Sequence, residues 1–359
     1  MSDRPIATRT TRYALGSAGA TPPIPLSESP FASSTRLKLA PQAPQNAVAV
    51  AARVDAPSPR TAELATTQSP DFTTSQPDSL DEEAPPAVRP VASWGWRGVV
   101  NTMPGVALRA GRLETTFTVD AEAARRASPT RTAQIAVVGD EGGCGRTWLT
   151  FALAAALAAA RRGGVIAWDG TRRGGPLAML GDGGGAGLES LTTTIHQPET
   201  VAAMSALTSR QDSAAEVLGW GRPTHAPLTR ADVEMIRRSA ARFYGVSVAD
   251  TDADPWGDVW EAIVATSAAV VVIHSGSRWS DDSAARTVAR VREVTPSAHI
   301  VGAALSKQAP PESVGLSWTR INRPPNLASW SRTSHRHQAD LMGLARSVTS
   351  SFNTTQGNL

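Results

Sequence analysis

Hydrophobic and polar positions divide the chain into two unlike parts. Residues 1–92 are rich in Pro, Ser, Thr and Ala and follow no sustained period of 2 or 3.6. Such a segment buries too little apolar surface to offset its chain entropy, so we predict a disordered tail over 1–92. Order is expected to begin at Trp94. A short amphipathic helix and a polar connector, at 110–132, then fill residues 93–132.

From residue 133 onward, near-continuous apolar runs alternate with stretches of helical spacing. The apolar runs predict strands at 134–139, 164–168, 215–219, 245–250, 268–274 and 298–304. The helical spacing predicts helices at 147–162, 199–208, 229–243, 257–266, 280–294 and 337–348. Apolar strands separated by helices favour a mostly parallel sheet covered on both faces. We therefore predict an α/β, doubly wound domain over 133–359.

A glycine-rich turn joins the first predicted strand to the first long helix, with the sequence Gly139-Asp-Glu-Gly-Gly-Cys-Gly-Arg-Thr147. Glycines let backbone N–H groups approach a triphosphate, and the N-terminus of the following helix attracts negative charge. A threonine at the end of such a loop can hold Mg²⁺. The succession of strand, glycine turn and helix therefore predicts a phosphate-binding loop of the P-loop type.

The charge balance is mild, with 35 Lys and Arg against 32 Asp and Glu, or +3. Only Lys38 and Lys307 are lysines, so an arginine at a lysine position is weak evidence of selection. Sequence-independent DNA binding is a weak prediction at this charge. It would use arginines of the later helices, namely Arg237, Arg238, Arg286, Arg290 and Arg292.

The single cysteine, Cys144, excludes an intramolecular disulfide. Its place beside phosphate-directed amides at a helix N-terminus is a setting that lowers a thiol pKa, although it also fills a variable loop position. The first residues lack the apolar region of a secretory signal, and no apolar run is long enough to span a bilayer. We expect a cytoplasmic protein with no membrane partner, its last helix docked on the domain.

Four landmarks, in order over 94–349, resemble the ParA/MinD family of P-loop ATPases. The glycine loop fits that family's Lys-Gly-Gly-x-Gly-Lys-Thr frame, with Glu141 and Arg146 at the two lysine positions. The strand ending at Asp169 resembles the family's second strand, and the strand ending at Asp250 resembles its Walker B strand. Trp94-Gly-Trp-Arg97 is similar to the start of ParA-like proteins linked to type VII secretion or partitioning.

The resemblance implies a site for ATP and Mg²⁺. Thr147 and Asp250 would hold the metal ion, and Asp169 and Asp250 would act in catalysis. The nucleotide would be bound by the loop and the start of the helix, with Thr147 serving both the metal ion and the nucleotide. These positions are Gly142, Gly143, Cys144, Gly145, Arg146, Thr147 and Trp148. The alternative for both aspartates is a helix-capping or loop role.

Two departures from the family frame weaken the implied chemistry. In the family, the first lysine reaches the partner subunit's nucleotide across a dimer, and Glu141 would place like charge beside that phosphate. Arg146 keeps its charge, but a guanidinium is wider and more planar than an ammonium. We therefore expect a degenerate ATPase or ATP-binding switch in DNA partitioning or type VII secretion, with weak or absent hydrolysis. A homodimer is compatible with this function. The alternative is a non-catalytic scaffold that binds a protein partner through its tail or surface.

Overall fold

The structure is a computed structural model that describes residues 89–129, 131–181, 187–193, 197–221, 226–322 and 329–352. Residues 1–88 of the predicted tail therefore lie outside the described residues. Residues 89–92 belong to the ordered part, because Val91 pairs with Arg109 in an antiparallel bridge and Ala92 is buried.

The described strands form one sheet in the order β3-β4-β2-β5-β1-β6-β7-β8, in which β3 is antiparallel to β4 and the other pairs are parallel. Their bounds are β1 Ala133–Val138, β2 Val165–Asp169, β3 Ser209–Arg210, β4 Glu216–Leu218, β5 Val246–Asp250, β6 Ala269–His274, β7 His299–Ala304 and β8 Trp318–Arg320. The predicted fold class, a doubly wound and mostly parallel α/β sheet, is confirmed.

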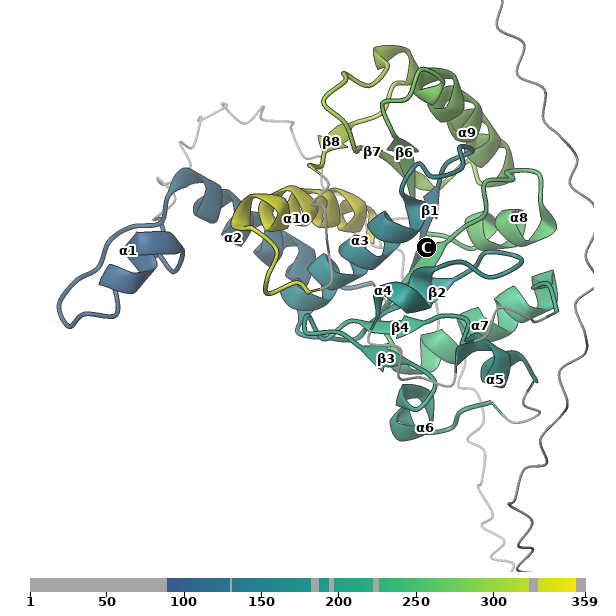
Figure 1. Cartoon of the computed structure of the whole chain (residues 1–359), viewed down its shortest axis with the longest axis horizontal. Helices are drawn as coiled ribbons and strands as arrows, with labels where there is room; N and C mark the ends of the chain where they lie inside the picture. Colours follow the sequence, from purple (N-terminus) through teal and green to yellow (C-terminus); the bar gives the residue numbers. More distant parts are fainter. Residues whose placement is uncertain are drawn as a thin grey trace, which may run out of the picture. The chain divides into compact units, whose positions relative to one another are not determined.

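Helices cover both faces of this sheet, with α2, α3 and α10 on one side and α7, α8 and α9 on the other (Figure 1). Their bounds are α1 Gly95–Val100, α2 Arg112–Arg126, α3 Arg146–Arg161, α4 Leu177–Leu180, α5 Gly187–Thr193, α6 Val201–Ser205, α7 Arg230–Phe243, α8 Asp258–Ala265, α9 Ser280–Val294, α10 His335–Thr349 and a 3₁₀ turn η1 Glu312–Val314. The two faces bury separate apolar clusters, as expected for parallel strands that are apolar throughout.

Strand β1 lies inside the sheet between β5 and β6, and all of its residues are buried. Its residue Val137 lies opposite Asp250 of β5 and Val271 of β6. Parallel strands end at the same edge of a sheet, where open α/β folds collect ligand-binding groups. The glycine loop after β1 and the ends of β2, β5 and β6 therefore lie side by side at the C-terminal edge.

Residues 110–132 are not a simple connector, because they contain the 15-residue helix α2. The leading helix also differs from its expected form: α1 has no buried residues. The expected docking of the last helix does occur. Leu341, Leu344 and Val348 of α10 are fully buried in the cluster formed with α2 and α3.

Candidate functional site

The glycine loop connects β1 to α3 through two left-handed positions. Gly143 has φ 75° and Gly145, which precedes the first residue of α3, has φ 103°. Glycine adopts this region without the steric cost that a Cβ brings. The predicted strand–loop–helix unit is therefore present, and its sequence matches its backbone.

Arg146 points back across this loop and bonds to the loop's own backbone. Its Nη1 donates to the carbonyl oxygens of Gly139 and Glu141, the latter at 2.8 Å, and lies 3.4 Å from the sulfur of Cys144. Its Nε donates to the carbonyl oxygen of Thr251, after β5, at 3.0 Å. One guanidinium thus joins both ends of the loop to the neighbouring strand. We call this set of bonds the Arg146 tether.

The acidic residues at the start of the loop bond to the segment that follows β6. Glu141 accepts hydrogen bonds from the hydroxyls of Ser275 and Ser277, at 2.7 and 2.8 Å. Asp140 accepts from Ser283 and pairs with Arg286 of α9 at 2.8 Å. Both carboxylates therefore hold the loop against its neighbours, and Glu141 faces hydroxyl groups.

Asp250 ends β5 with its carboxyl group fully buried. Burial raises its pKa to about 7. The hydroxyl of Thr147 lowers this pKa, and the charge of Asp169 on the neighbouring strand raises it. Neither carboxyl oxygen makes a hydrogen bond of ordinary geometry to the described residues. Because a buried polar group without a partner is costly, this carboxyl is the strongest candidate for a ligand-directed group.

Asp169 ends β2, directly opposite Asp250 in the register. Its carboxyl accepts from the N–H and hydroxyl of Thr171, at 3.0 and 2.5 Å, and from the N–H of Gly175 at 2.7 Å. Burial raises its pKa, while these bonds lower it. Its acceptor capacity serves the loop after β2, so the structure favours the loop-acid alternative over a catalytic role for this residue.

Two other predicted residues are buried. Burial raises the pKa of the Cys144 thiol, which overrides the lowering by Arg146, so the expectation of a lowered pKa is wrong. Trp148 is 6% exposed and belongs to the apolar cluster under α3. Neither side chain is placed as a solvent-facing contact for a nucleotide.

The donor set fits the two parts of Mg-ATP unequally. Thr147 and the buried carboxyl of Asp250 supply the hard oxygen ligands that Mg²⁺ prefers. The loop as arranged does not fit a triphosphate. Arg146 donates its hydrogen bonds to backbone carbonyls, and Glu141 adds a carboxylate at the start of the loop, where it accepts from Ser275. The structure thus keeps a metal-type pair and an altered phosphate loop.

Sequence reasoning missed the groups that hold the loop. Ser275 and Ser277 directly follow β6, and Ser283 and Arg286 lie on α9. The available signal was the position of the two serines after β6, because segments that follow neighbouring parallel strands meet at the same edge of the sheet. Nothing in the residue types alone paired them with Glu141 and Asp140.

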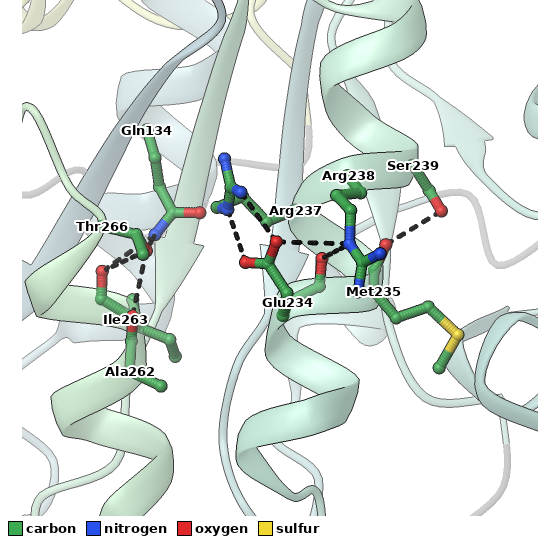
Figure 2. A network of polar contacts seen from close by, with 9 residues as sticks. All are labelled: Gln134, Glu234, Met235, Arg237, Arg238, Ser239, Ala262, Ile263 and Thr266. Carbon is green, nitrogen blue, oxygen red and sulfur yellow. Dashed lines mark hydrogen bonds and ion pairs between the residues drawn. The ribbon is translucent and has the colours of Figure 1, made fainter.

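Four of the five arginines proposed for DNA binding already face carboxylates. Arg237 and Arg238 of α7 both pair with Glu234, as Figure 2 shows beside the bonds from Gln134 to α8. Arg286 pairs with Asp140, and Arg290 of α9 pairs with acidic side chains at 3.0 and 3.1 Å. Their charge is balanced locally, which weakens the DNA-binding interpretation.

Comparisons with known proteins gave one partial sequence match and several structural matches. No protein-family model matches the chain. A stretch of 198 residues, 52% of the chain, is 29% identical to the ESX-1 secretion-associated protein EspI of Mycobacterium tuberculosis. The match spans 28% of that protein's length.

Solved structures that match include the ParA family ATPase of Chlorobium tepidum, at 14% identity, 62% and 96% coverage of the two chains and TM-score 0.45. A cobyrinic acid a,c-diamide synthase of Mycobacterium smegmatis, solved with an ATP analogue and magnesium, matches at 16% identity, 60% and 93% coverage and TM-score 0.40. Within the described residues, no helix is long and apolar enough to cross a membrane. The described strands form a doubly wound sheet, and the chain is similar to the ParA family ATPase named above.

Proposed function

We propose that this protein is a non-hydrolysing, ParA-like scaffold that binds a protein partner. The Arg146 tether carries the proposal. A P-loop positions phosphate with backbone N–H groups and a free cation, and phosphoryl transfer depends on that positioning and charge neutralisation. Here the cation at that position bonds to three backbone carbonyl oxygens of its own chain.

A triphosphate that entered the loop would have to displace these bonds. A hydrogen bond to a charged group contributes about 1.5–3 kcal/mol, and the carbonyl groups left behind would need new partners. Glu141 adds a like charge beside the incoming phosphate, while Ser275 and Ser277 hold that carboxylate in place. Both effects weaken ATP binding, and both weaken hydrolysis further.

Exposed apolar side chains on the hairpin 89–111 support the binding of a protein partner. Trp96 and Val99 are each 67% exposed, and Met103 is 58% exposed. The hairpin is internally braced, because Asn101 bonds to the backbone of Ala92 and Leu108. A rigid segment that displays large apolar side chains is typical of protein–protein interaction sites.

The cellular setting follows from resemblance. The partial match to a secretion-associated protein favours a role in type VII secretion, and the likeness to ParA-type ATPases favours DNA partitioning as the second setting. The aligned stretch is a minor part of the secretion-associated protein, so we propose the setting rather than that protein's activity. A homodimer remains part of the proposal only if ATP drives association.

One observation favours a second function, an ATP-binding switch without efficient turnover. The buried oxygens of Asp250 lie beside Thr147, and these two groups would hold Mg²⁺ if the Arg146 tether opened. Arg146 would then be free to contact phosphate. In this second function, Asp169 still holds the loop after β2, and Asp250 supplies the carboxylate for the metal ion.

Isothermal titration with Mg-ATP separates the two functions. If the protein is a scaffold, wild type should not bind Mg-ATP below millimolar concentrations in a way that depends on Thr147. Thr147→Ala should then leave the titration unchanged. The double variant Glu141→Lys with Arg146→Lys should gain such binding, because it restores two compact cations and removes the tether. Arg336→Lys, an exposed exchange of the same type on α10, is the control. Wild-type binding that depends on Thr147, or ATP-driven dimerisation in light scattering, would establish the switch instead.

A further inference from the structure

A cavity lined by arginines lies at the opposite edge of the sheet from the glycine loop. A cavity of about 490 Å³ opens where α2 and α3 end and β2 and β5 begin. Its lining residues are three arginines, one serine and three glycines, without a carboxylate: Arg125, Ser128, Arg161, Arg162, Gly163, Gly164 and Gly245. We call this the arginine cavity. The cavity is concave and cationic, and its walls are partly bare backbone.

The arginines of this cavity differ in how their charge is balanced. Arg125 pairs with Glu122, which also pairs with Arg126. Arg161 is partly buried and donates to the carbonyl oxygens of Ala124 and Ala127, the latter at 2.8 Å, without a carboxylate partner among the described ion pairs. Arg162 has no ion pair there either. The cavity thus holds two cations that no described carboxylate neutralises.

The ends of α2 and α3 account for part of this charge. Each helix C-terminus carries about half a negative charge, and arginines in a last turn stabilise it. Two such termini offset about one positive charge, whereas Arg161 and Arg162 bring two and the cluster around Glu122 retains one more. A partly desolvated arginine is stabilised by a further anion, because burial of a charge is costly unless it is paired.

The backbone at this point is unusual for a non-glycine residue. Arg162, Gly163 and Gly164 have φ of 61°, 110° and 68° in succession. Arginine is rarely found in the left-handed region, where glycine is the common residue at the end of a helix. A Cβ built at Gly164 would meet nothing within 4 Å, so the side of the cavity there is open. Arg162, at this strained backbone position, thus brings positive charge to the rim of the cavity.

From this geometry we propose that the arginine cavity binds a phosphate or pyrophosphate group. The guanidinium of Arg162 would contact the anion at the rim, and Arg161 would face it from the wall. The hydroxyl of Ser128 would donate from the end of α2. A guanidinium matches phosphate oxygens bidentately, which gives arginine an advantage over lysine in such a site.

The test is a pyrophosphate titration of the full chain, followed by the shift in unfolding temperature at constant ionic strength maintained with NaCl. Arg162→Gly removes the charge and places glycine at φ 61°, so the fold should be unchanged or more stable without ligand. We expect the apparent Kd for pyrophosphate to rise about tenfold in this variant. An unchanged Kd would overturn the site.

A second pair of variants tests the cavity without relying on Arg162. Ser128→Asp supplies an internal carboxylate, which should raise the melting temperature and abolish the response to pyrophosphate. Ser128→Asn, its neutral isostere, should keep the response. Arg278→Gly controls for the loss of net charge. Arg278 is exposed, lies outside the cavity and stacks over Trp279.

Two outcomes would assign the anion elsewhere. A response that survives Arg162→Gly and Ser128→Asp but disappears in Arg146→Gln would place pyrophosphate at the glycine loop and overturn the proposal. Binding of a duplex DNA that requires Arg162, without any shift by pyrophosphate, would identify a nucleic-acid contact in its place. Loss of the response in the two cavity variants alone supports the arginine cavity.

Discussion

At the scale of single residues, the site is defined by the hydrogen-bond partners of each charged group. Asp169 and Asp250 are neighbours in register and equally buried, yet Asp169 accepts three bonds from its own loop while the Asp250 carboxyl has none of ordinary geometry. The sequence placed both acids correctly at strand ends. The loop after β2 decides which carboxyl is left to bind a ligand. The course of that loop cannot be read from the two aspartates.

The pH dependence of stability should expose the buried carboxyl of Asp250. Its folded pKa is raised to about 7 from an ordinary 3.8, so the folded state holds its proton more tightly than the unfolded state between those values. Stability contributed by this group is therefore lost as pH rises through that window. Between pH 5 and 8, wild type should lose roughly 2–3 kcal/mol relative to Asp250→Asn, as measured by urea denaturation in EDTA. Parallel curves for the two proteins would contradict the raised pKa.

The residue types of the glycine loop were predictable, and the Arg146 tether was not. The pattern of glycines before a helix follows from local backbone needs, which the sequence carries directly. The tether depends on Thr251, more than a hundred positions later, and on the carbonyl of Gly139. The partners of Glu141 are equally remote. Long-range pairing of this kind requires the strand order, which single-sequence patterns do not contain.

At the scale of elements, strongly apolar segments were predicted well and weakly apolar ones were missed. The predicted strand at 134–139 corresponds to β1, shifted by one residue, and the helix at 280–294 coincides with α9. Helix α2 was missed because its buried face includes Glu114 and Asp120, which blur the apolar period. Strands β3 and β8 are only two and three residues long, too short to show a pattern.

Helix α10 should be as important for stability as any element that covers the sheet. Leu344 is fully buried in the apolar cluster that α10 shares with α2 and α3, so Leu344→Ala should reduce the free energy of unfolding by about 2–5 kcal/mol. Arg336→Ala, on the exposed side of the same helix, should change it by less than about 0.5 kcal/mol. Chemical denaturation monitored by tryptophan fluorescence measures both. Similar values for the two variants would mean that α10 is not docked.

At the scale of the whole described molecule, the hairpin 89–111 combines exposed apolar residues with basic charge. Its side chains include Arg97 and Arg109 and no acid, since the first carboxylate after it is the buried Glu114. Glu114 accepts bonds from the N–H groups of Ser93 and Trp94 and so fixes the base of the hairpin to α2. The display is thus built into the domain.

Two tryptophans two positions apart should behave oppositely. Trp96 is exposed, so Trp96→Ser should leave the free energy of unfolding within about 0.5 kcal/mol of wild type and reduce binding of an apolar dye. Trp94 stacks on His335 at 4.2 Å and contacts Phe117, so Trp94→Ser should destabilise the domain by about 1–3 kcal/mol. Thermal unfolding and dye fluorescence distinguish the two. A destabilising Trp96→Ser would show that the hairpin is supported by that side chain rather than displaying it.

The packing of α2 on α10 sets an order of events during synthesis. Asp120 of α2 pairs with Arg346 of α10 at 2.8 Å, across more than two hundred intervening residues. Until α10 has emerged from the ribosome, the nascent chain holds α2 and one face of the sheet without their cover. Such an incomplete chain exposes apolar surface that chaperones recognise and that promotes aggregation. Emergence of α10 from the ribosome is therefore the step that allows this domain to close.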